Sequence, residues 1–240
     1  MKNHNSFTSI PQSAAAANRY QAVRFFNSIN DFKQLPPDIG GEVAFAGRSN
    51  AGKSSALNVL TNQRQLARVS KTPGRTQLIN FFEVESERHL VDLPGYGYAK
   101  VPDSIRQHWQ KLLEQYLRER TALRGLMMLM DIRHPLTPLD QQLLGWCAAR
   151  GLAVHILLTK ADKLSRGAAM TVRQQVEKTL RTDYPPTSAQ LFSALTRLGV
   201  AEAHQRLDEW LGFAVKSCAP MANRPPPATG EPTAALARPD

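Results

Sequence analysis

The chain has 240 residues, 42% of them hydrophobic, which is enough for the core of one domain of roughly 190–200 residues. It has no apolar run near the ~18–20 residues of a membrane-spanning helix, no apolar signal-peptide core and only two cysteines, Cys147 and Cys218. These features argue against membrane and disulfide-rich secreted proteins and predict a reduced, cytoplasmic location. The formal net charge of +10 favours a polyanionic partner, although many basic proteins bind no nucleic acid.

Hydrophobic periodicity predicts strands alternating with helices. The predicted strands cover residues 23–26, 42–46, 78–84, 88–92, 125–131, 153–158 and 191–192. The predicted helices cover 53–61, 105–117, a segment opening at Thr137-Pro138, 168–181 and 200–211. This alternation indicates an α/β fold with a mostly parallel central sheet. We expect one domain over residues 21–213, between a flexible arm (1–20) and a disordered tail rich in Pro and Ala (214–240).

The stretch GRSNAGKS follows the strand predicted at 42–46 and matches the phosphate-binding loop G-x-x-x-x-G-K-[ST]. Gly47 and Gly52 permit a tight turn, and the amides of the loop can surround phosphate oxygens at a helix N-terminus. Lys53 would reach the β- and γ-phosphates, and the Ser54 hydroxyl would bind Mg²⁺. The residues expected around the phosphates are Gly47, Arg48, Ser49, Asn50, Ala51, Gly52, Lys53 and Ser54. The alternative is a glycine-rich turn that matches the pattern by chance.

A second stretch, Asp92-Leu93-Pro94-Gly95, lies at the end of the strand predicted at 88–92. An acid at this place can hold Mg²⁺, usually through water, while the Gly95 amide can bond the γ-phosphate. Taken alone, Asp-x-x-Gly is also a common turn.

Two later stretches suit recognition of guanine. Thr159-Lys160-Ala161-Asp162 follows the strand predicted at 153–158. The Asp162 carboxylate can accept hydrogen bonds from N1–H and the 2-amino group of guanine, which adenine lacks, while the Lys160 stem lies against the base. After the last predicted strand, which ends at Phe192, a backbone amide of Ser193-Ala194 can bond guanine O6, and Phe192 is expected to lie at the nucleotide too. A solvated Lys–Asp pair and an ordinary strand-to-loop junction are the alternatives.

In this order the stretches resemble the translation-factor-related P-loop GTPases, and more closely the EngB family of bacterial ribosome-assembly GTPases. The resemblance covers roughly residues 25–213. It is carried by GRSNAGKSS (47–55), KTPGRTQLINFF (71–82), DLPGYGYAK (92–100), DIRHPL (131–136) and TKAD (159–162). It implies a Ras-like three-layer α/β/α domain that binds GTP or GDP with Mg²⁺ and hydrolyses GTP slowly. It also implies a switch in assembly of the large ribosomal subunit, with rRNA as partner, and a link to cell division and septation. Nothing in the sequence suggests an obligate dimer, so we expect a monomer, and the lack of long apolar runs predicts no membrane partner.

The resemblance further implies two switch segments. Thr76 would join Ser54 and Asp92 at Mg²⁺ when a γ-phosphate is present, and Gly95 would begin the catalytic part of the second switch. The residues implied to line the nucleotide in the first switch are Gly74, Arg75, Thr76, Gln77 and Leu78. Tyr96 stands where Ras-like enzymes carry a water-orienting glutamine, so the side chain of that mechanism is absent; Tyr96 is interpreted as a packing residue.

Asn50 is a candidate for what replaces the glutamine. In related GTPases with this asparagine, a K⁺ ion beside the phosphates can neutralise charge in the transition state. We therefore expect Asn50, with Lys53, Thr76 and Gly95, to serve catalysis. The alternative is that Asn50 only shapes the loop.

Two basic clusters could contact rRNA phosphates, namely Arg64, Arg68, Lys71 and Arg75, and Arg118, Arg120 and Arg124. Each residue could equally be solvated charge. Two other functions stay open at this point. One is an ATP-using phosphotransferase, against which Asp162 argues; the other is a nucleotide-gated RNA-binding module in which hydrolysis is incidental.

Overall fold

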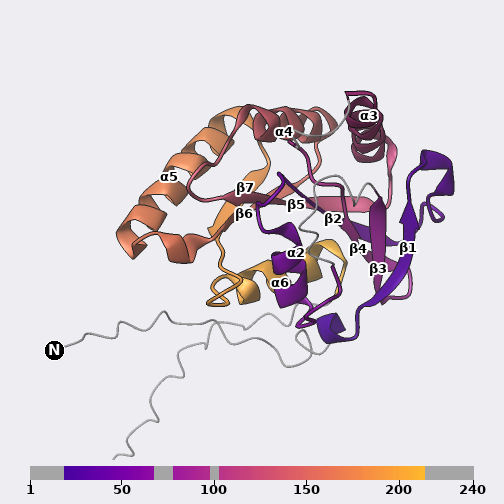
Figure 1. Cartoon of the computed structure of the whole chain (residues 1–240), viewed down its shortest axis with the longest axis horizontal. Helices are drawn as coiled ribbons and strands as arrows, with labels where there is room; N and C mark the ends of the chain where they lie inside the picture. The colour runs from indigo at the N-terminus through magenta and orange to yellow at the C-terminus, as the bar shows by residue number, and fades with distance from the viewer. Residues whose placement is uncertain (1–18, 68–77, 98–102, 214–240) are drawn as a thin grey trace, which may run out of the picture.

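The computed structural model describes residues 19–67, 78–97 and 103–213 (Figure 1). Thr76 and the other residues of the first switch up to Gln77 lie outside these ranges, as do Cys218 and most of the expected arm and tail. Within the described residues, no helix is both long and apolar enough to cross a membrane.

Seven strands of the described residues form one sheet in the order β1-β3-β4-β2-β5-β6-β7. They are β1 (Arg24–Ile29), β2 (Gly41–Gly47), β3 (Ile79–Glu85), β4 (Arg88–Asp92), β5 (Leu123–Asp131), β6 (Val154–Thr159) and β7 (Thr187–Leu191). From β4 to β7 all neighbours are parallel, whereas β1, β3 and β4 pair antiparallel. The predicted α/β fold with a mostly parallel sheet is therefore confirmed.

Helices cover both faces of the sheet and make three layers (Figure 1). The elements α3 (Asp103–Glu119), α4 (Pro138–Arg150) and α5 (Arg166–Asp183) lie on one face, and α2 (Lys53–Leu60) and α6 (Val200–Trp210) on the other. Each face has its own apolar core: Tyr116, Leu144 and Leu180 belong to the first, and Leu57 and Leu207 to the second. Two short 3₁₀ helices, η1 (Phe32–Gln34) and η2 (Ala161–Lys163), complete the described elements.

Burial explains why the central strands form. Every residue of β2 and β6 is buried, as continuous apolar runs in a parallel sheet require. In α4, the helix expected to open at Thr137-Pro138, the Thr137 amide donates to Asp140 Oδ2 at 2.9 Å, which caps the first turn. Cys147 of α4 points into the core, where burial raises the pKa of its thiol to about 12. That thiol is a packing group, because the reactive thiolate is suppressed.

Several boundaries differ from the predictions by a few residues, and two of the differences have a clear physical reason. The last strand runs over Thr187–Leu191 rather than 191–192, because Ser188 and Gln190 read as loop residues but bond to a buried histidine, His155. The arm predicted over 1–20 is also too long by two residues at least. Tyr20 is fully buried, its ring stacks on His204 at 4.6 Å, and its hydroxyl donates to Asp208 at 2.8 Å.

Candidate functional site

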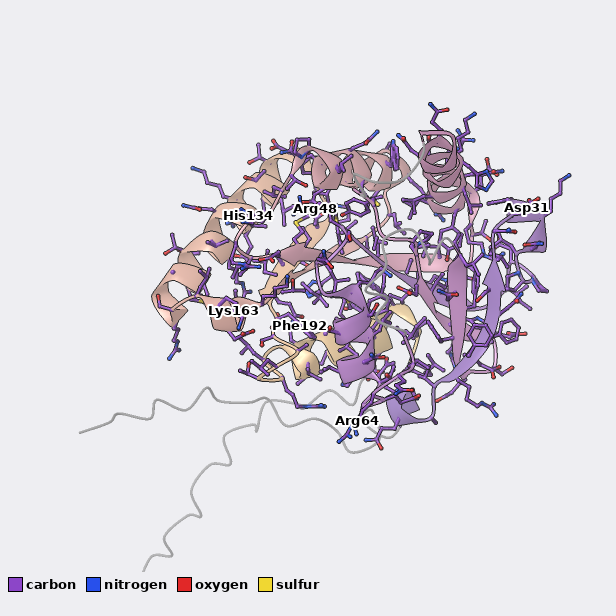
Figure 2. All side chains as sticks on the ribbon, in the orientation of Figure 1. Asp31, Arg48, Arg64, His134, Lys163 and Phe192 are labelled. Carbon is purple, nitrogen blue, oxygen red and sulfur yellow. The ribbon has the colours of Figure 1, made fainter. Side chains whose placement is uncertain are left out.

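The sequence motifs meet at one edge of the sheet. Gly47, Asp92, Asp131 and Thr159 are the last residues of β2, β4, β5 and β6, and β2, β4, β5, β6 and β7 are parallel neighbours. Open parallel sheets bind ligands in the crevice outside the carboxyl ends of their strands. Figure 2 shows Arg48, Lys163 and Phe192 in the half of the molecule away from Asp31, which lies beyond β1.

The loop between β2 and α2 has the shape that phosphate binding needs. A Cβ at Gly47 would lie 2.9 Å from the Leu129 carbonyl oxygen, so only glycine fits there. Gly52 has φ 94°, in the left-handed region, and Asn50 has φ 64°. The loop leads directly into α2 at Lys53, so its amides and the helix N-terminus face the same place.

Oxygen donors suited to Mg²⁺ stand beside this loop. The Lys53 ammonium contacts the Asp92 carboxylate directly, and both side chains are largely buried. Ser54, the next residue of α2, is half-buried. A hydroxyl and a carboxylate are hard oxygen ligands, which Mg²⁺ prefers, so these two residues fit the expected metal. The third expected ligand, Thr76, lies outside the described residues.

The loop after β6 presents a carboxylate fixed for base recognition. Asp162 lies in η2, and its Oδ1 accepts a hydrogen bond from Ser193 Oγ at 2.6 Å. That bond is the main reason why the pKa of Asp162 lies below its ordinary value, so the group is an anionic acceptor at neutral pH. The Ala161 amide bonds the Phe192 carbonyl at 3.1 Å and ties the two guanine segments together.

One expected contact needs correction. Ser193 was a candidate to donate its amide to guanine O6, but that amide donates to the Leu198 carbonyl at 3.1 Å. The Ser193 hydroxyl instead orients Asp162. Of the two candidate amides, Ala194 is therefore the one left for O6.

Lys160 joins the guanine loop to the phosphate loop and to Asp131 at the end of β5. Lys160 has φ 58°, and its ammonium lies 2.8 Å from the Asn50 carbonyl oxygen and 2.9 Å from Asp131 Oδ2. Arg133 also bonds Asp131, at 2.9 and 2.7 Å, and this bond is the main cause that holds the pKa of Asp131 far below its ordinary value. The motif DIRHPL contains Asp131, but the sequence alone predicts no role for this residue. The signal that could have indicated one is an acid at the end of a buried strand.

The Thr159 side chain also connects the guanine loop with the phosphate loop. Its hydroxyl bonds the Ala51 carbonyl at 2.6 Å and the Met130 carbonyl at 3.1 Å. A threonine at this position therefore fastens the guanine loop to the phosphate loop.

Tyr96 has a structural partner. Its hydroxyl donates to Asp140 Oδ1 at 2.8 Å, and burial raises the pKa of the phenol well above its ordinary value. The Ser49 amide bonds the Tyr96 carbonyl at 2.9 Å, so the residue also braces the phosphate loop. These contacts agree with the interpretation of Tyr96 as a packing residue.

The basic clusters separate into surface and buried members. Arg64, Arg118 and Arg124 are exposed, whereas Arg120 is 3% exposed and donates from Nε to Glu42 Oε1 at 3.0 Å. Arg120 also bonds the Pro36 carbonyl at 2.8 Å. The expectation that Arg120 could contact RNA is therefore wrong, because its buried guanidinium is already bonded to Glu42 and to the Pro36 carbonyl. Arg68, Lys71 and Arg75 lie outside the described residues.

Comparison with known proteins agrees with this geometry. Residues 42–160 match the family described as 50S ribosome-binding GTPase. A protein of Methylococcus capsulatus, "Probable GTP-binding protein EngB", is 57% identical over 192 residues, which are 79% of this chain and 91% of that protein. The protein of the same name from Stenotrophomonas maltophilia is 57% identical over 194 residues, 80% of this chain and 97% of that protein.

Solved structures show the same fold at low sequence identity. The crystal structure of a probable GTP-binding protein engB matches with a TM-score of 0.59 at 18% identity, covering 72% of this chain and 100% of that one. Era in complex with MgGDPNP and nucleotides 1506-1542 of 16S ribosomal RNA matches with a TM-score of 0.55 at 20% identity, covering 71% of this chain and 56% of that one.

Proposed function

This chain belongs to the EngB family of GTP-binding proteins and contains a GTPase domain, and from that premise we propose that it is a slow, Mg²⁺-dependent GTP switch in assembly of the large ribosomal subunit. The observation that carries the proposal is the meeting of Lys53, Asp92 and Asp162 at the carboxyl edge of one sheet. This arrangement can bind a phosphate chain at one end and a guanine at the other.

In the proposed complex the loop amides and Lys53 bind the phosphates. Ser54 and Asp92 would hold Mg²⁺, joined by Thr76 when GTP is bound, and the bound metal would supply positive charge beside the β- and γ-phosphates. Lys53 then exchanges its contact with Asp92 for phosphate oxygens. Gly95 donates its amide to the γ-phosphate, so its position, and that of the segment after it, depends on the nucleotide.

The reaction is slow in this proposal, since Tyr96 offers no group to orient water: its hydroxyl is engaged by Asp140. Asn50 is left as the side chain beside the phosphates that can recruit K⁺. It is exposed at the tip of the loop, and its carbonyl is held by Lys160 at 2.8 Å.

We expect Asn50→Ala to reduce the GTP turnover measured in K⁺ by roughly tenfold or more, comparable to loss of one transition-state donor. The wild type should slow similarly when Na⁺ replaces K⁺, while the variant should be indifferent to the exchange. Phosphate release in matched KCl and NaCl measures both. Turnover that ignores both the ion and the substitution would contradict a role for Asn50. A variant that binds GTP without hydrolysing it, yet supports growth, would instead favour an RNA-binding module with incidental hydrolysis.

The ribosomal partner is supported by charge and by relatives. The formal net charge is +10, and the matched family is described as 50S ribosome-binding. Era, which shares the fold, was solved with a fragment of 16S ribosomal RNA. We place the contact at the exposed Arg64 and at Arg68, Lys71 and Arg75 of the following segment, whose arrangement would respond to GTP. The switch acts as a monomer, and defects in division and septation would follow from reduced ribosome supply.

Cosedimentation with purified ribosomal subunits tests this partner. The chain loaded with a non-hydrolysable GTP analogue should pellet with large subunits, and less so with GDP or with small subunits. Because phosphate contacts release counterions, binding should fall steeply between 50 and 200 mM salt, with the slope reduced by about one for each arginine replaced. Arg64→Gln should reduce the slope, and Arg181→Gln, at an exposed position of α5, serves as the matched control. Binding that is independent of salt or of nucleotide would contradict the proposal.

A further inference from the structure

A polar row is buried on the face of β6 and β7 that α6 covers. Gln190 of β7 has no exposed surface, and its side-chain amide donates to the Gly199 carbonyl at 2.7 Å and to the Leu191 carbonyl at 3.3 Å. Its Oε1 lies 2.8 Å from His155 Nε2, and His155 Nδ1 lies 2.7 Å from Ser188 Oγ. An apolar side chain at position 190 could fill the same space but could make none of these hydrogen bonds.

The bonds fix the direction of the Gln190 amide. Because Nε2 of Gln190 faces two carbonyl oxygens, it must donate, and Oε1 must accept the proton on His155 Nε2. His155 Nδ1 then accepts from the Ser188 hydroxyl. Burial lowers the pKa of His155 to about 4, so this neutral form persists at physiological pH.

Gln190 is bonded to the end of the loop that carries Ala194. The loop begins at Ser193, whose amide bonds the Leu198 carbonyl at 3.1 Å, and it ends at Gly199, which has φ 78°. A Cβ at Gly199 would lie 2.4 Å from Gln190 Nε2, so the two groups are in close contact. Gln190 therefore holds the end of the loop that carries Ala194.

We propose that Gln190 is a positioning residue for purine recognition: with His155, it holds the 193–199 loop so that the Ala194 amide meets the 6-oxo group of guanine. The inference rests on the proposed guanine site. The backbone around Asp162 has its own support, since the Ala161 and Lys163 amides bond the Phe192 and Lys160 carbonyls at 3.1 and 2.9 Å. The Ser193 hydroxyl that orients Asp162 comes from the start of the loop, next to β7, whereas Gln190 bonds the end of the loop at Gly199. Loss of Gln190 should therefore weaken the 6-oxo contact and spare recognition of the 2-amino group.

The test compares three nucleotides in the full chain. We would measure the affinities of GDP, 6-thio-GDP, whose sulfur is a weak acceptor, and IDP, which lacks the 2-amino group. Wild type should favour GDP over 6-thio-GDP by about three- to tenfold, the factor of one hydrogen bond. In Gln190→Met this ratio should fall towards one, while the ratio of GDP to IDP stays as in wild type. Gln174→Met, the same change at an exposed position of α5, should alter neither ratio.

Each other outcome has a definite meaning. Equal weakening of all three nucleotides in Gln190→Met, or an unchanged preference for GDP over 6-thio-GDP, overturns the positioning role. If Gln190→Met does not fold, Ser188→Ala, which leaves His155 Nδ1 without its donor and so loosens the His155 ring that contacts Gln190, should lower the same ratio, and no change would overturn the inference. A wild type that binds GDP and IDP equally would overturn the guanine site itself, which separates the two failures.

Discussion

Replacing Asp162 with asparagine is expected to weaken GDP binding by about a hundredfold and to give the chain affinity for xanthine nucleotides. The carboxylate accepts two guanine donors in our account, and losing charge-assisted bonds of this kind costs about 3 kcal/mol. The asparagine amide can donate to the 2-oxo group of xanthine, which a carboxylate repels. Calorimetric titration of GDP and XDP into wild type and Asp162→Asn measures both effects.

A matched control is available for this change. Asp183→Asn alters an exposed acid at the end of α5 and should leave both affinities unchanged. If Asp162→Asn still binds GDP like wild type and ignores XDP, Asp162 does not contact the base.

Replacing Lys53 with methionine is expected to lower GTP affinity by about a hundredfold and to abolish measurable hydrolysis. Lys53 is the cation assigned to the β- and γ-phosphates, where charge develops during the reaction. Without nucleotide the change should also destabilise the fold, because it leaves the buried Asp92 carboxylate without its cation. Nucleotide binding, phosphate release and thermal unfolding of the apo protein report these effects separately.

The double variant Lys53→Met/Asp92→Asn distinguishes folding from function. Removing the orphaned charge should recover part of the lost stability, while GTP binding and hydrolysis stay low. A double variant as unstable as Lys53→Met would show that the unpaired Asp92 charge is not what destabilises the single variant. Recovered hydrolysis would contradict the role of both residues.

Much of the fold could be read from the sequence, because its strongest signals are local. The buried apolar runs of β2, β5 and β6 and the period of α3 predict their elements directly. The capping residues of α4 and the glycines of the phosphate loop are likewise required by backbone geometry at their own positions. These signals place the phosphate and guanine segments at one edge of a parallel sheet.

The corrections concern residues whose partners are distant in sequence. In the sequence Arg120 resembles a surface charge, because its partner Glu42, to which it donates a hydrogen bond, lies 78 positions away. Tyr20 reads as part of a polar arm, yet Asp208 and His204 of α6 bury it. The start of β7 does not stand out in the sequence because Ser188 and Gln190 are polar, and their side chains find partners in His155 and, for Gln190, in the Gly199 carbonyl. No local pattern contains such pairings.

The same reason explains the unforeseen part of the candidate site. The sequence shows that Asp131 ends an apolar strand, β5. Its role depends on Lys160 of another loop, which contacts Asp131 and also bonds the Asn50 carbonyl of the phosphate loop. The Ser193 amide could not be excluded as a base contact before Leu198 was seen to accept it.

The most direct test of the assembly role is a ribosome profile after depletion. In a bacterium depleted of its own EngB homologue, sucrose-gradient profiles should show precursors of the large subunit and few mature ribosomes. Expression of this chain should restore the mature peak, whereas Lys53→Met at the same level should not. A normal profile after depletion, or equal rescue by Lys53→Met, would contradict a GTP-dependent role in large-subunit assembly.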